Sequence, residues 1–369
     1  MQPADNSAHQ IRVLVVDDSA VVRQVLEAVL SQEPDMSVMV ASDPLIALQK
    51  MARVRPDVIV LDLEMPRMDG LTFLRKIMAE DPIPTVICSG VAARGTEAAL
   101  RALDEGAVGI ITKPKLGLRN FLYESGLVLT DMVRAAARAR VRRRFSSLAL
   151  PTMVLPAISP ARQPSSQPLR PSRADVFSKM IVAMGASTGG TEALAQILAA
   201  MPRDSPGIVV VQHMPEVFTA AFAQRLDRLS QIEVKEAEHG DCISAGRALI
   251  APGNRHMSVT RRGTQSFVEI SEGPLVSRHR PSVDVLFRSV AHAAGASALG
   301  IILTGMGSDG AQGLLEMKNA GAETVAQDEA SCVVFGMPKE AIACGAVNLI
   351  LPLSKIPAKI LMTDPKKKL

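Results

Sequence analysis

The first 115 residues alternate short apolar runs with amphipathic stretches. The runs are apolar throughout, and the stretches between them carry apolar residues at helical spacing. Strands that are apolar on both faces are typical of parallel sheets covered by helices on each side. The pattern therefore predicts a doubly wound (βα)5 domain. Its expected strands are Ile11–Val16, Val38–Val40, Val58–Leu61, Thr85–Cys88 and Val108–Thr112, and its expected helices are Ala20–Leu30, Pro44–Arg53, Leu71–Ala79, Thr96–Leu103 and a fifth from about Leu118 to about Ala139.

The same rhythm returns at Lys179. A shorter, hairpin-like β pattern interrupts it between Ile232 and Ile270, with turns at Ala245–Gly246 and Arg262–Gly263. We therefore expect a second doubly wound, mainly parallel α/β domain with a β-hairpin insertion. Its expected strands are Ile181–Met184, Ile208–Gln212, Leu299–Leu303 and Thr324–Gln327, and its expected helices are Glu192–Ala200, Phe218–Leu229, Val283–Ala293 and Ala311–Ala320.

The segment between the two domains differs in composition. Arginine recurs from Arg134 to Arg144, and Pro, Ser, Gln and Arg dominate residues 151–173, which is typical of a linker without a core. We expect a first domain over residues 10–130, a linker over 131–178 and a second domain over 179–362. The arginines are either the solvated end of a helix or an electrostatic contact for an acidic partner.

Composition narrows the class of protein. The chain has 369 residues, of which 47% are hydrophobic and 21% charged, with a formal net charge of +4; such a chain is neither fibrous nor largely disordered. It has no Trp and one Tyr, which disfavours a single-stranded nucleic-acid binder, because such proteins need exposed aromatic side chains for stacking. The polar N-terminus and the absence of a run of about 18–20 apolar residues argue against a signal peptide and membrane insertion. Four cysteines without a CxxC pair predict reduced, mostly buried thiols in a cytoplasmic protein.

Polar residues follow the strands of the first domain at their carboxyl ends. Asp17 and Asp18 come after the first strand, and Asp62 comes after the third. The carboxyl ends of parallel strands meet at one edge of a sheet, where three carboxylates favour a hard cation such as Mg²⁺. Ser89 and Lys113 end the fourth and fifth strands, so a hydroxyl and an ammonium group could hold an added phosphoryl group at the same edge.

This set of residues resembles a two-component receiver domain. The matching segments are VVDDSA at Val15–Ala20, DLEMPRMDG at Asp62–Gly70 and TKP at Thr112–Pro114. The resemblance implies that a histidine kinase phosphorylates Asp62. It further implies that Mg²⁺ is held by Asp17, Asp18 and Asp62, and that the phosphorylated state is read by Ser89 and Lys113.

A second set of polar residues lies in the second domain. Ser187 occupies the G-x-S-x-G spacing of a nucleophile elbow, between an apolar strand and a helix. His213 follows the next strand and Asp309 a later one, so all three can converge at one sheet edge. A serine nucleophile needs a base, and the base needs an orienting acid. The chain order Ser, His, Asp differs from the Ser, Asp, His order of the α/β-hydrolases, which predicts a different fold.

Other histidines compete for the role of base. His213 is distinguished only by its position at a strand end, whereas the others lie outside the domains, in a helical pattern or in loop and hairpin segments: His9, His239, His256, His279 and His292.

Two other functions fit parts of the sequence. Gly305–Gly310 spells G-x-G-x-x-G between a strand and a helix, with Asp328 about 20 residues further on, which is the pattern of a dinucleotide site. A receiver-controlled nucleotide-binding enzyme is therefore the second hypothesis, although it leaves Ser187 and His213 unexplained. The third is a DNA-binding output module that uses the basic linker, but no helix-turn-helix pattern supports it.

Residues from about Met180 to Leu353 resemble the catalytic domain of the CheB protein-glutamate methylesterases of chemotaxis. The matching segments are GASTGGTEAL, QHMPEVFTAAFAQRL, EAEHGD, IAPGNRHM, HRPSVD, LTGMGSDGA and AQDEASCVVFGMP. The resemblance implies a hydrolase that demethylates glutamate γ-methyl esters on the cytoplasmic helices of chemoreceptors, and that also deamidates glutamines. It implies partners of two kinds, methylated receptors and a chemotaxis histidine kinase, with no nucleic acid and no cofactor in the catalytic domain.

The resemblance also assigns roles to individual residues. Ser187 attacks the ester carbonyl, His213 transfers the proton and Asp309 orients the imidazole. The backbone N–H of Met306 is the implied oxyanion donor, and one N–H at the start of the helix after Ser187 is a second candidate. Thr188 and Arg280 are weaker candidates for the substrate pocket. The unphosphorylated receiver is expected to block the catalytic face.

Overall fold

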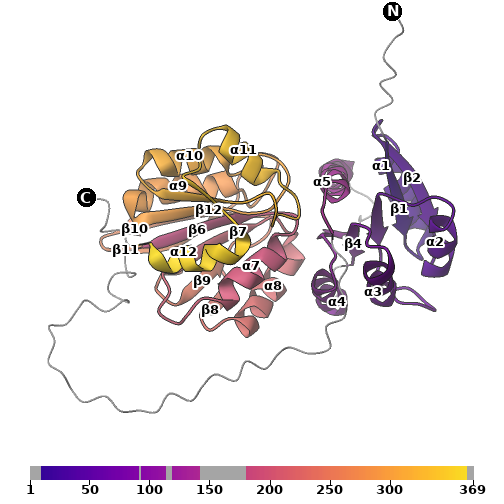
Figure 1. The fold of residues 1–369 in the computed structure, drawn as a ribbon, viewed down its shortest axis with the longest axis horizontal. Helices are drawn as coiled ribbons and strands as arrows, with labels where there is room; N and C mark the ends of the chain where they lie inside the picture. Colours follow the sequence, from indigo (N-terminus) through magenta and orange to yellow (C-terminus); the bar gives the residue numbers. More distant parts are fainter. Residues whose placement is uncertain (1–9, 91–92, 114–118, 142–179, 364–369) are drawn as a thin grey trace, which may run out of the picture.

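The computed structural model describes residues 10–90, 93–113, 119–141 and 180–363. They form two α/β domains, each with its own parallel sheet (Figure 1). The predicted fold class is therefore confirmed. None of the described helices is long and apolar enough to cross a membrane.

The N-terminal domain has a five-stranded parallel sheet in the order β2-β1-β3-β4-β5. Its central strands are almost completely buried, because α1 and α5 cover one face and α2, α3 and α4 the other (Figure 1). The elements are β1 (Ile11–Val16), α1 (Ala20–Leu30), β2 (Met36–Ala41), α2 (Pro44–Met51), β3 (Val58–Leu61), α3 (Gly70–Glu80), β4 (Thr85–Ser89), α4 (Ala93–Asp104), β5 (Gly109–Thr112) and α5 (Arg119–Ala137).

The C-terminal domain has a seven-stranded sheet in the order β14-β13-β12-β6-β7-β9-β8, and all its pairings are parallel. Helices α9, α10 and α11 cover one face, and α7, α8 and α12 cover the other (Figure 1). The elements are β6 (Ile181–Ala186), α7 (Gly190–Ala199), β7 (Gly207–Gln212), α8 (Glu216–Leu229), β8 (Glu233–Glu236), β9 (Arg247–Ile250), β10 (His256–Arg262), β11 (Gln265–Ser271), α9 (Val283–Ala294), η1 (Gly295–Ser297), β12 (Ala298–Ile302), α10 (Ala311–Asn319), β13 (Glu323–Gln327), α11 (Met337–Ala343), β14 (Leu349–Leu351), η2 (Leu353–Lys355) and α12 (Ile356–Met362).

The expected hairpin region contains one hairpin and two strands of the main sheet. β10 and β11 pair antiparallel across the turn at Arg262–Gly263, as predicted. The hairpin-like reading of the first half was wrong, because β8 and β9 pair parallel to each other across the turn at Ala245–Gly246 and β9 pairs with β7. Both strands are only four residues long, so their apolar pattern is too short to distinguish the two arrangements.

The expected boundary at residue 130 falls inside a helix. α5 continues to Ala137, close to the end expected for the fifth helix. Val133 and Ala136 are completely buried against the sheet, and Arg134 pairs with Glu33 and Asp35 beside α1. The first part of the arginine run is therefore part of the N-terminal domain. Arg142, Arg143 and Arg144 and most of the expected linker lie outside the described residues.

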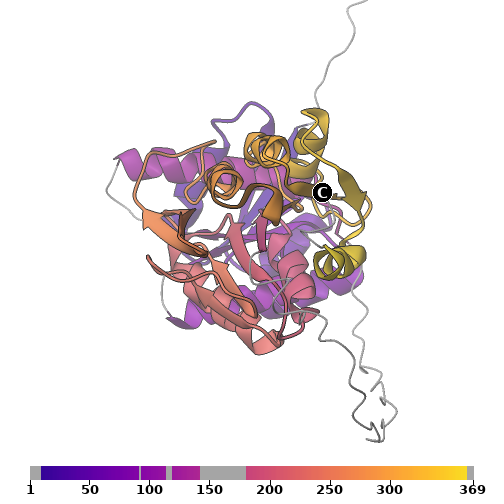
Figure 2. The ribbon, with the colours of Figure 1, turned by 90° about the vertical axis from the view of Figure 1, so that its left-hand side faces the viewer.

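The two domains pack directly against each other, with α4 in contact with α7 and α8 (Figure 1), and in the view of Figure 2 the N-terminal domain lies behind the C-terminal domain. Buried apolar side chains form one continuous cluster from the N-terminal sheet to α7 and α8. Arg225 on α8 forms an ion pair with Asp104 at the end of α4. Arg140 contacts the other domain twice, through its backbone N–H to the carbonyl of Val333 at 3.0 Å and through its side chain to Glu329 at 2.8 Å.

Candidate active site

Ser187 lies on a tight turn between β6 and α7. Its backbone N–H donates to the carbonyl of Thr304 at 3.0 Å, which ties the turn to the loop after β12. Gly189 has a φ of 77°, a conformation that is unfavourable for a residue with a Cβ. A Cβ on Gly189 would also lie 2.5 Å from the Cβ of Val333. The glycines of the G-x-S-x-G pattern thus let the chain turn sharply at the carboxyl edge of the sheet.

His213 and Asp309 meet at the same edge. The Nε2 of His213 lies 2.8 Å from Oδ2 of Asp309, and both side chains are almost completely buried. The Nδ1 of His213 is buried without a hydrogen-bond partner among the described residues. Because Nε2 is held by the carboxylate, Nδ1 is the nitrogen that remains for proton transfer.

The start of α9 holds the Asp309 carboxylate. Oδ1 accepts hydrogen bonds from the Ser282 hydroxyl at 2.7 Å and the Asp284 N–H at 3.1 Å, and Oδ2 accepts one from the Val283 N–H at 2.8 Å. Burial alone would raise the pKa of Asp309, but the hydrogen bonds from His213, Ser282 and Val283 lower it to about 2. Asp309 is therefore an anion that can stabilise a protonated His213.

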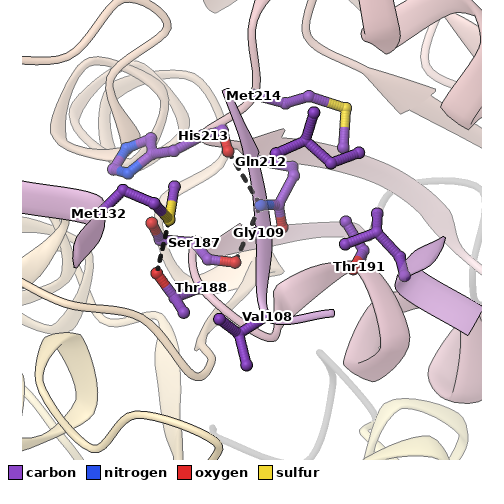
Figure 3. Close-up of a pocket in the computed structure, with 11 residues that line it drawn as sticks. Val108, Gly109, Met132, Ser187, Thr188, Thr191, Gln212, His213 and Met214 are labelled. Carbon is purple, nitrogen blue, oxygen red and sulfur yellow. Dashed lines mark hydrogen bonds between the residues drawn. The ribbon is translucent and has the colours of Figure 1, made fainter. Parts of the chain in front are cut away.

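The hydroxyl of Ser187 points to the side of the pocket where the His213 ring and the Met132 thioether lie (Figure 3). Within the described part of the chain, Ser187 Oγ and His213 Nδ1 do not form a hydrogen bond. Serine–histidine contacts are often long in enzymes without substrate and shorten when substrate binds. The structure thus brings the three predicted residues to one edge, with the histidine–aspartate bond formed and the serine–histidine bond open.

Met306 lies next to a close approach between two loops. A Cβ on the preceding Gly305 would lie 2.7 Å from the Cβ of Ser187, so only a glycine lets the loop come this near to the serine. The N–H of Met306 has no hydrogen-bond partner among the residues that the structure describes. The segment that carries this N–H thus comes close to Ser187 at Gly305.

His279 is the neighbour that sequence reasoning did not single out. Its ring stacks on that of His213, with the centroids 3.7 Å apart and the planes 6° from parallel. One nitrogen of each ring and a carboxylate oxygen of Asp309 lie within 4.8 Å of one another, so the two histidines and Asp309 form one polar group at the edge of the sheet. The HRPSVD segment places His279 just before α9, but only the fold reveals that it reaches His213.

The remaining candidate residues have local partners. His256 bonds to Pro274 and Ser282, and His292 bonds to Arg288 within α9. His239 is exposed and accepts a bond from the Ile270 N–H, and His9 lies outside the described residues. Arg280 donates to the side-chain oxygen of Asn254 and to the carbonyl of Gly273, so these guanidinium donors are engaged within the protein. Asp328 accepts bonds from Ser331.

The N-terminal domain closes the space in front of Ser187. The enclosed volume is about 10 Å³, which is room for about one water molecule. The Met132 sulfur on α5 lies 3.7 Å from the Thr188 hydroxyl (Figure 3). The carbonyl of Val108 accepts a bond from the Gly189 N–H at 3.2 Å. This N–H at the start of the helix after Ser187, the second expected oxyanion donor, is therefore engaged by the other domain.

A second polar cluster lies at the carboxyl edge of the N-terminal sheet. Asp17, Asp18 and Asp62 each offer a ligand atom, and these atoms all lie within 4.8 Å of one another. Lys113 Nζ lies 3.0 Å from Asp17 Oδ2 and 2.8 Å from Asp62 Oδ2. Burial raises the pKa of Asp62, against the opposing effect of Lys113. Three carboxylates with these spacings, two of them buried and that of Asp18 exposed, fit a hard cation such as Mg²⁺.

The expected phosphate-reading residues flank this cluster. Ser89 ends β4 and is buried, and Lys113 directly follows β5. Burial would lower the pKa of Lys113, but Asp62 and Asp17 raise it above its ordinary value, so the ammonium group keeps its charge.

All four cysteines are free thiols, of which Cys88 and Cys332 are buried.

Comparisons with known proteins agree with both domains. Residues 182–360 match the family model "CheB methylesterase", and residues 13–119 match "Response regulator receiver domain". The chain is 57% identical over 96% of its length to protein-glutamate methylesterase/protein-glutamine glutaminase 5 of Anaeromyxobacter dehalogenans, covering 97% of that protein. It is also 57% identical over 95% of its length to protein-glutamate methylesterase/protein-glutamine glutaminase 2 of Pseudomonas syringae pv. tomato, covering 98% of it. The crystal structure of the Thermotoga maritima CheB methylesterase catalytic domain is 39% identical, with a TM-score of 0.49, over 50% of this chain and 98% of that one.

Proposed function

The chain belongs to the CheB methylesterase family and carries a response regulator receiver domain, and from this premise we propose that it is a phosphorylation-controlled protein-glutamate methylesterase and protein-glutamine glutaminase. Its substrates are glutamate γ-methyl esters and glutamines on the cytoplasmic helices of chemoreceptors. The observation that carries the proposal is the bond between His213 and Asp309, at the sheet edge where the elbow residue Ser187 lies.

The hydrolysis follows from the residues at that edge. Ser187 Oγ attacks the ester carbonyl while His213 Nδ1 accepts its proton, and the Asp309 anion stabilises the resulting imidazolium. The N–H of Met306 stabilises the oxyanion of the tetrahedral intermediate. His213 returns the proton to the ester oxygen as its bond to the carbonyl carbon breaks, so that methanol leaves; with a glutamine, the amide nitrogen takes the proton and ammonia leaves. A water molecule then releases the glutamate by the same proton transfers.

The packing of the two domains supports control by the receiver. In the arrangement described, Met132 and the Val108 carbonyl lie against Thr188 and Gly189. A space of about 10 Å³ does not admit a glutamyl ester, so the receiver must move before substrate binds. This is the unphosphorylated, inhibited state in the proposal.

The acidic cluster supports phosphorylation at Asp62. Asp17, Asp18 and Asp62 would hold Mg²⁺, which shields the negative charge of an incoming phosphodonor. A chemotaxis histidine kinase is the proposed donor. A phosphoryl group on Asp62 adds about two negative charges, and Lys113 and Ser89 can turn toward it. Ser89 ends β4 and Lys113 follows β5, and α4 and α5 are the helices that come next in the chain after these strands.

The decisive experiment is methanol release from methylated receptor membranes, measured with and without a small phosphodonor and Mg²⁺. We expect slow basal release, faster release with the phosphodonor, and covalent labelling of Ser187 by a fluorophosphonate probe. Labelling at another residue, or no methanol in either condition, would overturn the proposal. A nucleotide-binding enzyme would instead bind NAD in a titration.

A further inference from the structure

The ring of His279 lies flat on the candidate base. The 3.7 Å centroid distance and the 6° angle place its whole face against His213. Asp309 holds the edge of the His213 ring through Nε2, but a single bond at one edge leaves the ring free to tilt about that contact. The second contact, on the face, removes this freedom.

The chain around His279 is built to hold this ring. The Nδ1 of His279 lies 2.7 Å from the carbonyl of Ser277; because a carbonyl only accepts, Nδ1 carries the proton. Ser277 and Arg278 have positive φ values of 51° and 66°, a conformation that costs free energy for residues with a Cβ. A bridge between Val276 and His279 closes the loop. Strained backbone persists only where surrounding contacts enforce it.

The charges around His279 keep its ring neutral. Burial and the neighbouring His213 lower the pKa of His279 to about 3, against the opposing effect of Asp309. Arg278, which pairs with Asp131 of α5 at 3.6 Å, adds to the lowering. His279 therefore remains uncharged throughout the pH range in which a serine esterase works. A neutral aromatic face attracts a cation stacked on it, whereas a second imidazolium would repel it.

We propose that His279 is a positioning residue for His213 in the esterase reaction proposed above. Its neutral ring fixes the plane of the His213 imidazole, keeps Nδ1 available to Ser187, and favours the imidazolium that forms in the transition state. His279 does not itself exchange a proton with substrate. The inference rests on the proposed function, in which His213 is the base for Ser187, but not on the identity of the ester.

Two substitutions separate the stacking from the anchoring bond. His279→Phe keeps a flat neutral ring and loses the bond to Ser277, whereas His279→Gln keeps a polar group and loses the ring. Loss of the stacked ring removes part of the stabilisation of the imidazolium. We therefore expect His279→Gln to lower kcat roughly fivefold, the equivalent of ~1 kcal/mol, with little change in KM. We expect His279→Phe to restore most of the loss.

The assay uses the full chain with Mg²⁺ and the phosphodonor, and His292→Gln is the matched control. His292 is exposed on α9 and bonded only to its own helix, so its variant should retain wild-type kcat. The rate of Ser187 labelling by the fluorophosphonate probe is measured in parallel. Labelling requires the serine and histidine but no receptor, so it tests His279 even if the wild type releases no methanol from receptors.

A third measurement follows His213 directly. The proton in the bond between His213 and Asp309 should give a downfield NMR resonance that persists in His279→Phe and broadens in His279→Gln. Equal labelling rates for wild type and His279→Gln would overturn the proposal. A His279→Phe variant as slow as His279→Gln would also overturn it, because an aromatic ring at this position would then not account for the effect on the rate.

Discussion

Ser187 is the residue at which the proposed chemistry is most easily removed. We predict that Ser187→Ala abolishes methanol release, because loss of a triad nucleophile costs on the order of 10⁴–10⁶ in kcat. The fold should survive, since the side chain is small and lies at a loop. The exposed Ser244→Ala is the matched control and should be fully active. Near wild-type release from Ser187→Ala, measured on receptor membranes, would exclude this serine as nucleophile.

Asp309 determines which nitrogen of His213 carries the proton, because its carboxylate lies 2.8 Å from Nε2. We predict that Asp309→Asn slows hydrolysis by about 10⁴, the loss seen when an amide favours the wrong tautomer in the worked serine-protease case. Circular dichroism should confirm that the variant is folded. If the loop from Gly305 to Gly310 instead held a dinucleotide, the same change would alter nucleotide affinity and leave serine labelling unchanged.

The Asp309 carboxylate also makes stability depend on pH. Its pKa is about 2 in the folded protein and 3.8 as the ordinary value, so the folded state favours the anion. The resulting stabilisation is present above about pH 4 and is lost as the pH falls toward 2. At 1.4 kcal/mol for each pKa unit, it amounts to about 2 kcal/mol. Urea unfolding of wild type and Asp309→Asn between pH 4 and pH 2 should therefore converge; parallel curves would contradict the assignment.

At the scale of elements, the contact between α4 and α8 offers a test of inhibition. Asp104 and Arg225 form an ion pair between the two helices, and Arg225 is only 13% exposed. We predict that Asp104→Arg raises basal methanol release about fivefold or more, because it places two cations together and disfavours the covered state. Adding Arg225→Asp should lower it again.

Glu97→Arg is the control for that charge change. Glu97 lies on the same helix, but its partner Arg101 belongs to α4 itself. Basal release from this variant should match wild type. If it rose as much as in Asp104→Arg, the effect would come from net charge rather than from the contact between the helices.

Elements with long periodic patterns could be predicted from the sequence, and short or composite ones could not. The bounds of β1, β3 and α1 agree exactly with the expected ranges, because each combines a full apolar pattern with a clear boundary residue. β8 and β9 have four residues each, and their parallel pairing depends on distant strands. The boundary expected at residue 130 cuts through α5, because the arginines near its end make this part of the helix look polar although Val133 and Ala136 are buried.

The residues of the candidate site also fall into those that the sequence predicts and those that it does not. Ser187, His213 and Asp309 were predictable because each follows a strand, and strand ends of a parallel sheet meet. His279 follows no strand of the sheet, and its contact with His213 depends on the loop before α9. The side chains of Met132 and Val108 could not be predicted at Ser187 either, because no pattern in one domain encodes which surface of the other it covers.

At the scale of the whole molecule, the proposed switch is the movement of the receiver domain onto and away from the catalytic edge around Ser187. We predict that Asp62→Asn keeps the basal rate and loses all stimulation by a phosphodonor. A fragment from Lys179 onward should be faster than the unphosphorylated full chain and insensitive to the phosphodonor, because Met132 and the Val108 carbonyl are removed. Methanol release by the three proteins gives the comparison. A fragment no faster than the full chain would mean that the receiver does not restrain the enzyme.

The hydrogen bond from the Gly189 N–H to the Val108 carbonyl of the receiver domain bears on how the enzyme's activity depends on the amount of protein in the cell. The group that occupies the N–H is part of the same polypeptide, so the covered fraction is a unimolecular quantity and is unaffected by dilution. A cell that makes twice as much of this protein would double its maximal rate without changing the fraction restrained. Under the proposed control, the restraint on the unphosphorylated enzyme is therefore independent of expression level, and fluctuations in copy number would change the basal rate only in proportion to the amount of protein.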